Sequence, residues 1–209
     1  TSSATSAVAN VNDDPTGSVT ISGTATEDQV LTAANTLADE DGLGTISYQW
    51  NRAGSAISGA TSSTYTLVQA DVGSAITVTA SYTDSQSTAE SETSSATSAV
   101  ANVNDDPTGS VTISGTATED QVLTAANTLA DEDVLGTISY QWKRAGSAIS
   151  GATSSTYTLV QADVGSAITV TASYTDGQGT AESSTSSATS AVANVNDDPT
   201  GSVTISGTA

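Results

Sequence analysis

Pairs of adjacent carboxylates recur at one kind of position in this chain. The stretch Val-Asn-Asp-Asp-Pro occurs at Val11–Pro15, Val103–Pro107 and Val195–Pro199. Two neighbouring aspartates repel each other and have poor strand propensity, so they need a solvent-exposed turn or a cation. Carboxylate oxygens and the amide oxygen of asparagine are donors that hard cations such as Ca²⁺ prefer. The two hypotheses for this joint are a calcium-binding segment and an acidic turn without a ligand.

The composition favours a cation as partner. The chain has 209 residues, with 23 acidic and only 3 basic side chains, for a formal net charge of −20. Such a charge repels nucleic acid and anionic membrane surfaces, and it attracts divalent cations. Without cysteine there are no disulfides to stabilise small domains, and a bound metal is the obvious substitute. Mg²⁺ demands strict octahedral geometry and Zn²⁺ prefers His and Cys ligands, so Ca²⁺ is the expected ion.

The residue types argue against catalysis. The sequence has no histidine or cysteine and a single lysine, so it cannot assemble a Ser-His or Cys-His nucleophile. It contains no glycine-rich phosphate loop, and nothing in it indicates a cleft in which two carboxylates would cleave a glycoside. It also has no signal peptide and no apolar run long enough to span a membrane. We therefore expect a protein that is not an enzyme and does not insert into membranes.

A long internal repeat positions the acidic residues. The segment TSSATSAVANVNDDPTGSVTISGTA begins at Thr1, Thr93 and Thr185, a period of 92 residues. This period suits one Ig-sized sandwich better than a solenoid repeat. We expect β-sandwich repeats at 13–104 and 105–196, the last strand of a preceding repeat at 1–12 and the first strand of a following one at 197–209. The chain would then be a fragment of a longer tandem array. The two complete copies differ at five positions, which are Gly42/Val134, Asn51/Lys143, Ser85/Gly177, Ser87/Gly179 and Glu92/Ser184.

Alternation of apolar and polar residues predicts around seven short strands per repeat. The strands named from this pattern in the first repeat are residues 17–23, 45–51, 64–68, 74–84 and 93–103. Asp71–Gly73 has the composition of a turn, and no capped helical pattern occurs. The predicted fold is all-β, with tandem Ig-like (cadherin-like) Greek-key sandwiches in an elongated array. Trp50, Tyr48, Tyr65 and Tyr82 share the inward phase, which favours core packing over stacking on sugars.

The loops of an antiparallel sandwich alternate between its two poles. With strands lettered A to G, the start of strand A and the BC and FG loops share the N-terminal pole. The AB and EF loops and the end of strand G share the C-terminal pole. Acidic loops of two successive repeats should therefore converge on the joint between them. Two carboxylates about 5 Å apart repel by roughly 3 kcal/mol at an effective dielectric constant near 20, and a hard cation reverses the sign.

The expected ligands are the oxygen donors of these loops and joints. Around the central joint they are Glu27, Asp28, Asp71, Asn104, Asp105, Asp106, Asp131, Asp133 and Asp176. At the equivalent positions of the other two joints they are Asn12, Asp13, Asp14, Asp39, Asp41, Asp84, Glu119, Asp163, Asn196, Asp197 and Asp198. Only the joint at 103–107 has a full repeat on both sides, so we expect the one complete site there and half-sites at the others.

Several acidic residues have structural alternatives. Asp71 precedes Gly73, and an aspartate in such a loop commonly fixes a turn by accepting hydrogen bonds from backbone amides. Asp28 is equally well explained as a solvated neighbour of Glu27. We interpret Glu90 and Glu92 as solvated charges.

This arrangement of acidic loops resembles that of cadherin ectodomains. Cadherins use a Glu in the AB loop, acidic residues in the EF loop, a linker containing Asn-Asp and a D-x-D in the next BC loop. Glu27, Asp71, Asn104–Asp106 and Asp131–Asp133 match these positions, although the single EF-loop Asp and the Asp-Asp linker depart from the cadherin pattern. The strand sequences are more similar to the Ig-like or cadherin-like repeats of bacterial RTX-type giant surface adhesins. This resemblance covers the whole repeat.

The resemblance implies a structural role outside the cell. We expect an extender segment of an adhesin on the surface of a Gram-negative, marine bacterium, with a part in cell adhesion and biofilm formation. Ca²⁺ at the joints would stiffen the array and project a distal binding region. The expected partners are calcium ions, neighbouring repeats of the same chain and, weakly, other copies head to tail. Two alternatives stay open: an Ig-like module that binds a glycan or host surface, and a self-associating filament element.

Overall fold

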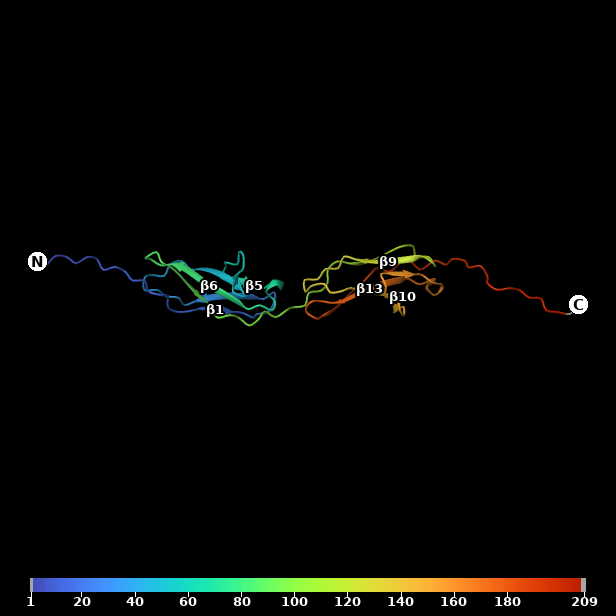
Figure 1. Cartoon of the computed structure of the whole chain (residues 1–209), viewed down its shortest axis with the longest axis horizontal. Coiled ribbons are helices and arrows are strands. Elements are labelled where there is room, and N and C mark those ends of the chain that lie inside the picture. The colour runs from blue at the N-terminus through green and yellow to red at the C-terminus, as the bar shows by residue number, and fades with distance from the viewer. Residues whose placement is uncertain (1, 208–209) are drawn as a thin grey trace. The chain divides into compact units, whose positions relative to one another are not determined.

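The chain divides into two units, Thr1–Val103 and Asn104–Ala209, hereafter repeat 1 and repeat 2. The computed structural model describes residues 2–207, so Thr1, Thr208 and Ala209 of the expected end segments lie outside the described residues. The division falls between Val103 and Asn104, one residue before the expected one. Each repeat is built from strands joined by short loops (Figure 1).

Repeat 1 forms two antiparallel sheets. Its elements are β1 (Val19–Ser22), β2 (Val30–Asn35), β3 (Ser47–Arg52), β4 (Ser55–Ala56), β5 (Thr64–Thr66), the 3-10 turn η1 (Gln69–Asp71), β6 (Ile76–Thr83) and β7 (Ala89–Thr93). The sheet orders are β1-β2-β5 and β4-β3-β6-β7. These two sheets make an Ig-like β-sandwich, which confirms the predicted fold class.

Repeat 2 has the same design. Its elements are β8 (Val111–Ser114), β9 (Val122–Asn127), β10 (Ser139–Arg144), β11 (Ser147–Ala148), β12 (Thr156–Thr158), the 3-10 turn η2 (Gln161–Asp163), β13 (Ile168–Thr175) and β14 (Ala181–Thr185). The sheet orders are β12-β9-β8 and β11-β10-β13-β14, again antiparallel.

The predicted alternation of apolar and polar residues correctly identifies core residues of the sandwich. Along β6, Ile76, Val78, Ala80 and Tyr82 are buried, whereas the Thr and Ser residues between them are at least partly accessible. Trp50 on β3 lies opposite Val78 and is fully buried, and its Nε1 donates to the backbone carbonyl of Ser62 (2.9 Å). The core role expected for this tryptophan is confirmed, and Trp142 is equally buried in repeat 2.

The expected strand over 93–103 does not form as a regular strand. The last strand, β7, ends at Thr93. After it, the amides of Ser94, Thr97 and Val100 donate to the carbonyls of Val78, Ile76 and Ser74, which are every second residue of β6 and the segment before it. Successive hydrogen bonds are therefore three residues apart in segment 94–100 but two residues apart along β6, which does not match the even spacing of a regular strand pair. The hydroxyls of Ser94 and Thr97 accept from the amides of Val78 and Ile76, where a regular ladder would place a carbonyl.

The expected end strands are also not formed within the described residues. Residues 2–12 and 197–207 contain no strand, and Val8 and Ile205 are 98% exposed. Their equivalents within the repeats are largely covered; Val100, the counterpart of Val8, is 2% exposed. The equivalent of 197–207 within the chain contains β8, so strand formation in that segment depends on pairing with the body of a repeat. In residues 2–207 no helix is long and apolar enough to cross a membrane.

Candidate metal centre

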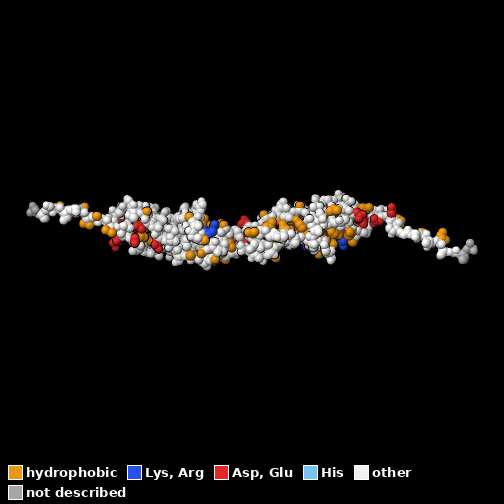
Figure 2. Space-filling view, viewed as in Figure 1, with side chains coloured by type: hydrophobic (Ala, Val, Ile, Leu, Met, Phe, Trp, Pro, Cys, Tyr) orange, Lys and Arg blue, Asp and Glu red, His pale blue; other side chains and the backbone are white. Residues whose placement is uncertain are grey.

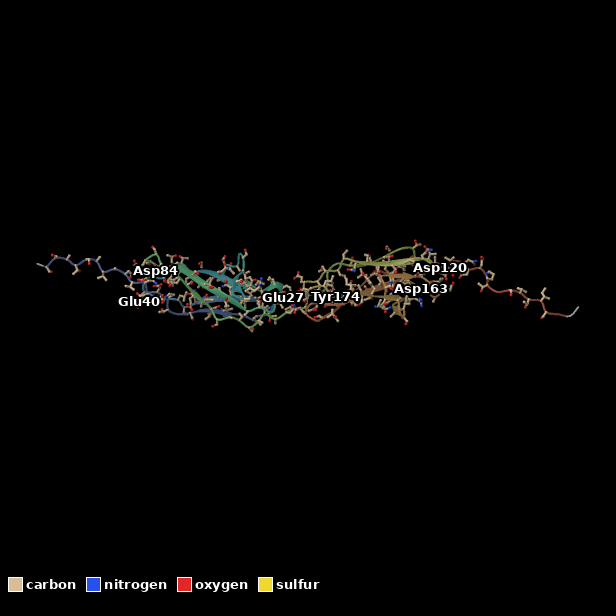
Figure 3. All side chains as sticks on the ribbon, viewed as in Figure 1. Glu27, Glu40, Asp84, Asp120, Asp163 and Tyr174 are labelled. Carbon is tan, nitrogen blue, oxygen red and sulfur yellow. The ribbon has the colours of Figure 1, made fainter. Side chains whose placement is uncertain are left out.

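The loops of each repeat gather at two poles, as the sequence predicted. At the N-terminal pole of repeat 1, the amide of Ser85 in the loop after β6 donates to the carbonyl of Asp41 in the loop before β3 (3.2 Å). At the opposite pole, the amide of Glu27 donates to the carbonyl of Ala101 (2.9 Å). Figure 3 shows Asp84 at one end of repeat 1 and Glu27 at the other.

Acidic side chains hold the incoming joint at the N-terminal pole. Asn12 donates from Nδ2 to Oε1 of Glu90 on β7 (2.8 Å), and the amide of Asp13 donates to Oδ2 of Asp41 (3.0 Å). Repeat 2 makes the same two bonds, from Asn104 to Glu182 (2.9 Å) and from Asp105 to Asp133 (3.0 Å). In these two joints the asparagine and the first aspartate are therefore bound by the repeat that follows them.

The D-x-D of the BC loop is fixed by the backbone and by a tyrosine. Oδ1 of Asp39 accepts from the amide of Asp41 (2.8 Å), and its Oδ2 accepts from the hydroxyl of Tyr82 (2.6 Å). Burial raises the pKa of Tyr82 well above its ordinary value, and the bond to Asp39 raises it further. This tyrosine therefore stays protonated and acts as a donor. Asp131, Asp133 and Tyr174 repeat the geometry in repeat 2.

The FG-loop aspartate carries an oxygen without a partner. Asp84 is 6% exposed, and its Oδ1 accepts from the amides of Gln86 (2.9 Å) and Thr88 (2.7 Å). Its Oδ2 is buried and makes no hydrogen bond. Asp176, 7% exposed, shows the same satisfied Oδ1 and the same unpartnered Oδ2. A buried carboxylate oxygen without a partner is costly, so its recurrence in both repeats points to a ligand that it would bind.

No basic side chain neutralises this pole. The three basic residues lie on β3 and β10, and the ion pairs among residues 2–207 are Arg52–Asp71 (2.7 Å) and Arg144–Asp163 (2.6 Å). In Figure 2 the red acidic side chains gather at the end of repeat 1 nearest the N-terminus, and the blue side chains lie away from them. The N-terminal pole therefore combines several carboxylates with no counter-charge from Lys or Arg in the described residues.

At the C-terminal pole a buried glutamate holds the outgoing joint. Glu27 is 2% exposed, and its Oε2 accepts from the amide of Val103 (3.3 Å). In repeat 2, Glu119 is 3% exposed and accepts from the amide of Val195 (3.1 Å). The two expected ligands of the AB loop thus lie directly against the joint that leaves their repeat.

The EF-loop aspartates have the turn-fixing role that was their structural alternative. Asp71 is fully buried, and Oδ1 accepts from Nε of Arg52 (2.7 Å). Its Oδ2 accepts from the hydroxyl of Tyr65 and the amide of Val68 (both 2.9 Å). The bond to Asp71 raises the pKa of Arg52, which stays charged. Asp163 makes the equivalent bonds, so both oxygens of each EF-loop aspartate are already used.

The remaining expected ligands are exposed. Their side chains make no hydrogen bond within residues 2–207; they are Asp14, Asp28, Asp106, Asn196, Asp197 and Asp198. Asp28 occupies a left-handed turn at φ 62°. Sequence reasoning missed Glu90 and Glu182, which bind the joint asparagines and are more than solvated charges. It also missed a second role of the buried Tyr82 and Tyr174, whose hydroxyls donate to Asp39 and Asp131 of the D-x-D segments.

The donor set suits a hard cation. In repeat 1 the carboxylates of Asp39, Asp41 and Asp84 share one pole with the acidic start of the joint, and in repeat 2 Asp131, Asp133 and Asp176 do the same. All the donors are oxygens, which matches Ca²⁺ and lacks the nitrogen and sulfur that Zn²⁺ prefers. The buried Oδ2 of the FG-loop aspartate is the donor whose chemistry most clearly fits such an ion.

Comparisons with known proteins assign neither a family nor a function to this chain. No protein-family model and no curated protein matches the sequence. Solved structures similar to the chain include three N-terminal domains of the bacteriophage RB49 Highly Immunogenic Outer Capsid protein (Hoc). The identity is 16%, the TM-score is 0.29, and the match covers 82% of this chain and 59% of that one. A likeness at this level carries no functional argument.

Proposed function

We propose that the chain is an extender segment of a bacterial cell-surface adhesin, in which Ca²⁺ at the joints holds successive repeats in a stiff rod. The ion is ligated mainly by the repeat that follows the joint, through Asp131, Asp133, Asp176 and the joint residue Asp105. Without the ion these carboxylates repel one another, and the joint becomes flexible.

One observation carries this proposal. The FG-loop carboxylate is more than nine-tenths buried and its Oδ2 has no partner. In both repeats its loop bonds to the acidic BC loop, and neither Arg–Asp ion pair involves it. Burial and the bond to Asp39 raise the pKa of Tyr82, and the charges of Asp39, Glu90 and Asp84 raise it further, as expected for a pole crowded with carboxylates. Burial and the bond to Asp131 raise the pKa of Tyr174 in the same way, and the charges of Asp131, Glu182 and Asp176 raise it further. A cation satisfies the open oxygen and offsets the repulsion at once.

The anchoring of the joint supports a mechanical role. The amide of Val103 is bound by repeat 1, whereas Asn104 and the amide of Asp105 are bound by repeat 2. Because Val103 and Asn104 are consecutive, no residue of the joint separates the part bound by repeat 1 from the part bound by repeat 2. A short joint of this kind is suited to stiffening by an ion, because few backbone dihedrals need to be fixed.

Thermal unfolding of the whole chain tests the ion. Because Ca²⁺ binds only the folded state, it should raise the free energy of unfolding by about 2.7 kcal/mol at a hundredfold excess over Kd. The variant Asp84→Asn/Asp176→Asn keeps the bonds of Oδ1 and should lose most of this calcium-dependent gain. The matched control Glu40→Gln/Glu132→Gln removes one exposed charge from each BC loop and should keep the gain. Equal melting temperatures of the wild type in Ca²⁺ and in chelator would contradict the proposal.

A further inference from the structure

Two of the five differences between the repeats lie next to each other, one in the BC loop and one in the FG loop. A Cβ added to Gly42 would lie 2.4 Å from Oγ of Ser85. In repeat 2 the residues are exchanged, and a Cβ on Gly177 would lie 2.7 Å from the carbonyl oxygen of Asp133 and 3.0 Å from Cβ of Val134. The close approach of the BC and FG loops therefore leaves room for a side chain on only one of them, which is Ser85 of the FG loop in repeat 1 and Val134 of the BC loop in repeat 2.

The exchange changes the backbone cost of the BC loop. Gly42 has φ 95°, which glycine adopts freely, whereas Val134 has φ 75°, where a β-branched residue is strained. The loops are also joined differently. The amide of Ser85 bonds to Asp41 alone (3.2 Å), while the amide of Gly177 bonds to the carbonyls of both Asp133 (2.8 Å) and Val134 (3.0 Å). Repeat 2 therefore has backbone strain in its BC loop that repeat 1 lacks, and its single FG-loop amide is shared between two carbonyls.

These two loops carry the carboxylates of the candidate site, with the buried unpartnered Oδ2 of Asp84 or Asp176 in one of them. We propose that this pair of positions sets the calcium affinity of the repeat that carries it. The Gly42–Ser85 arrangement gives tighter binding than the Val134–Gly177 arrangement. The inference rests on the proposed calcium site and adds how neighbouring repeats differ in their ion occupancy.

The direction follows from the ion-free loop. When no ion is bound, repulsion among the carboxylates favours opening of the BC loop, and opening also releases Val134 from the left-handed region. Gly42 gains nothing comparable. The closed conformation that binds the ion is therefore less populated with valine, and the apparent Kd rises by that fraction. Strain at one such residue corresponds to roughly a tenfold change in Kd.

Calorimetric titration of the whole chain with Ca²⁺ tests this proposal one repeat at a time. Asp84→Asn silences repeat 1 and leaves repeat 2 as the reporter. In that background, Val134→Gly/Gly177→Ser should tighten binding about tenfold. With Asp176→Asn as background, Gly42→Val/Ser85→Gly should weaken binding by the same factor, and Gly42→Val alone should weaken it further because of the clash with Ser85. Each comparison stays within one repeat, so the neighbour of that repeat is constant.

The control is the other difference in the same loop. Gly179→Ser installs the residue that repeat 1 has at position 87, where φ is 74°, and a Cβ at Gly179 has no atom within 4 Å. Its affinity should change less than about twofold. Melting in chelator establishes that each variant is folded. Calcium binding that the paired exchanges leave unchanged, or move in the opposite direction, would overturn this inference alone. A wild-type chain that binds no Ca²⁺ would overturn the proposed function as well.

Discussion

Two buried aspartates at opposite ends of β6 have different roles, and their hydrogen bonds distinguish them. Both oxygens of Asp71 are occupied, by Arg52, Tyr65 and the amide of Val68. Asp84 has one oxygen satisfied by its own loop and one buried oxygen with no partner. The first arrangement completes a structural network, and the second is incomplete without a ligand. Sequence alone ranks both residues as candidate ligands, because it shows that a loop is acidic without showing which donors reach its oxygens.

The buried pair at Asp71 should matter for stability and not for the ion. Asp71→Asn weakens the bond to Arg52 and leaves a guanidinium without its counter-charge. We expect a loss of about 2–4 kcal/mol in the unfolding free energy of repeat 1, nearer the lower figure because the Arg52 side chain is 31% exposed. Urea unfolding measures this loss, and the exposed control Glu92→Gln should change stability by less than about 0.5 kcal/mol. A calcium response lost together with Asp71 would show that this residue is a ligand after all.

The residues that sequence reasoning missed share a physical cause. Glu90 stands on β7, 78 residues from the Asn12 it binds, and Tyr82 reaches Asp39 across 43 residues. Both contacts depend on which strands become neighbours. The alternation of apolar and polar residues along β6 correctly predicts that the Tyr82 ring is buried. It does not show that the hydroxyl at the end of this ring reaches the BC loop at the N-terminal pole.

Among the elements, strands in which buried apolar residues alternate regularly with polar ones are predictable from the sequence, and strands without this alternation are not. The pattern around β6 is regular, and the predicted segment contains the observed strand. β2 has the sequence VLTAAN, in which the exposed Val30 precedes the buried Leu31 and small alanines face both sides, so its alternation is masked. Identical letters also give different results: Gly17–Gly23 contains β1, whereas Gly201–Gly207 forms no strand. Pairing partners decide that difference, and local propensity cannot.

Close packing of the BC loop against β6 gives a second stability prediction. A Cβ on Gly44 would lie 2.0 Å from the carbonyl oxygen of Thr83, a backbone atom that cannot move aside easily. Gly44→Ala should destabilise repeat 1 by about 3 kcal/mol, as measured by urea unfolding. The comparison variant Gly54→Ala has open space and a left-handed φ of 80°, so only backbone strain of about 1 kcal/mol is expected. If the two variants cost the same, the close contact at Gly44 is not real.

The network around η1 predicts a loss of stability at alkaline pH. Burial raises the pKa of Tyr65 above the ordinary value of 10.0, and its hydrogen bond to Asp71 raises it further; Tyr157 behaves alike. A pKa that is higher in the folded chain contributes stability that is complete below the unfolded value and declines as pH rises above it. Urea unfolding between about pH 8 and about pH 11.5 should show a plateau followed by this decline.

A matched variant isolates the contribution of the network. Tyr65→Phe/Tyr157→Phe removes the titrating hydroxyls and should make the alkaline decline shallower. Some decline should remain, since Tyr82 and Tyr174 also have raised pKa values. An alkaline profile as steep as that of the wild type would exclude these two tyrosines as its cause.

At the scale of the whole chain, two near-identical repeats reproduce the same contacts independently. The bonds from joint to BC loop, from joint asparagine to the last strand and from AB-loop glutamate to the outgoing joint occur in both. The repeat length, the sandwich fold and the grouping of acidic loops by pole were all predictable from the sequence, because they follow from periodicity and antiparallel topology. The occupied oxygens of Asp71 and the open oxygen of Asp84 were not, because they depend on side-chain geometry.

The central claim is that Ca²⁺ stiffens the joint between repeats, and small-angle X-ray scattering of the whole chain tests it most directly. In millimolar Ca²⁺ we expect a larger maximum dimension and a narrower distribution of interatomic distances than in chelator. The variant Asp84→Asn/Asp176→Asn should scatter like the chelated wild type under both conditions, and Glu40→Gln/Glu132→Gln like the wild type. Scattering curves of the wild type that superimpose with and without Ca²⁺ would contradict the account.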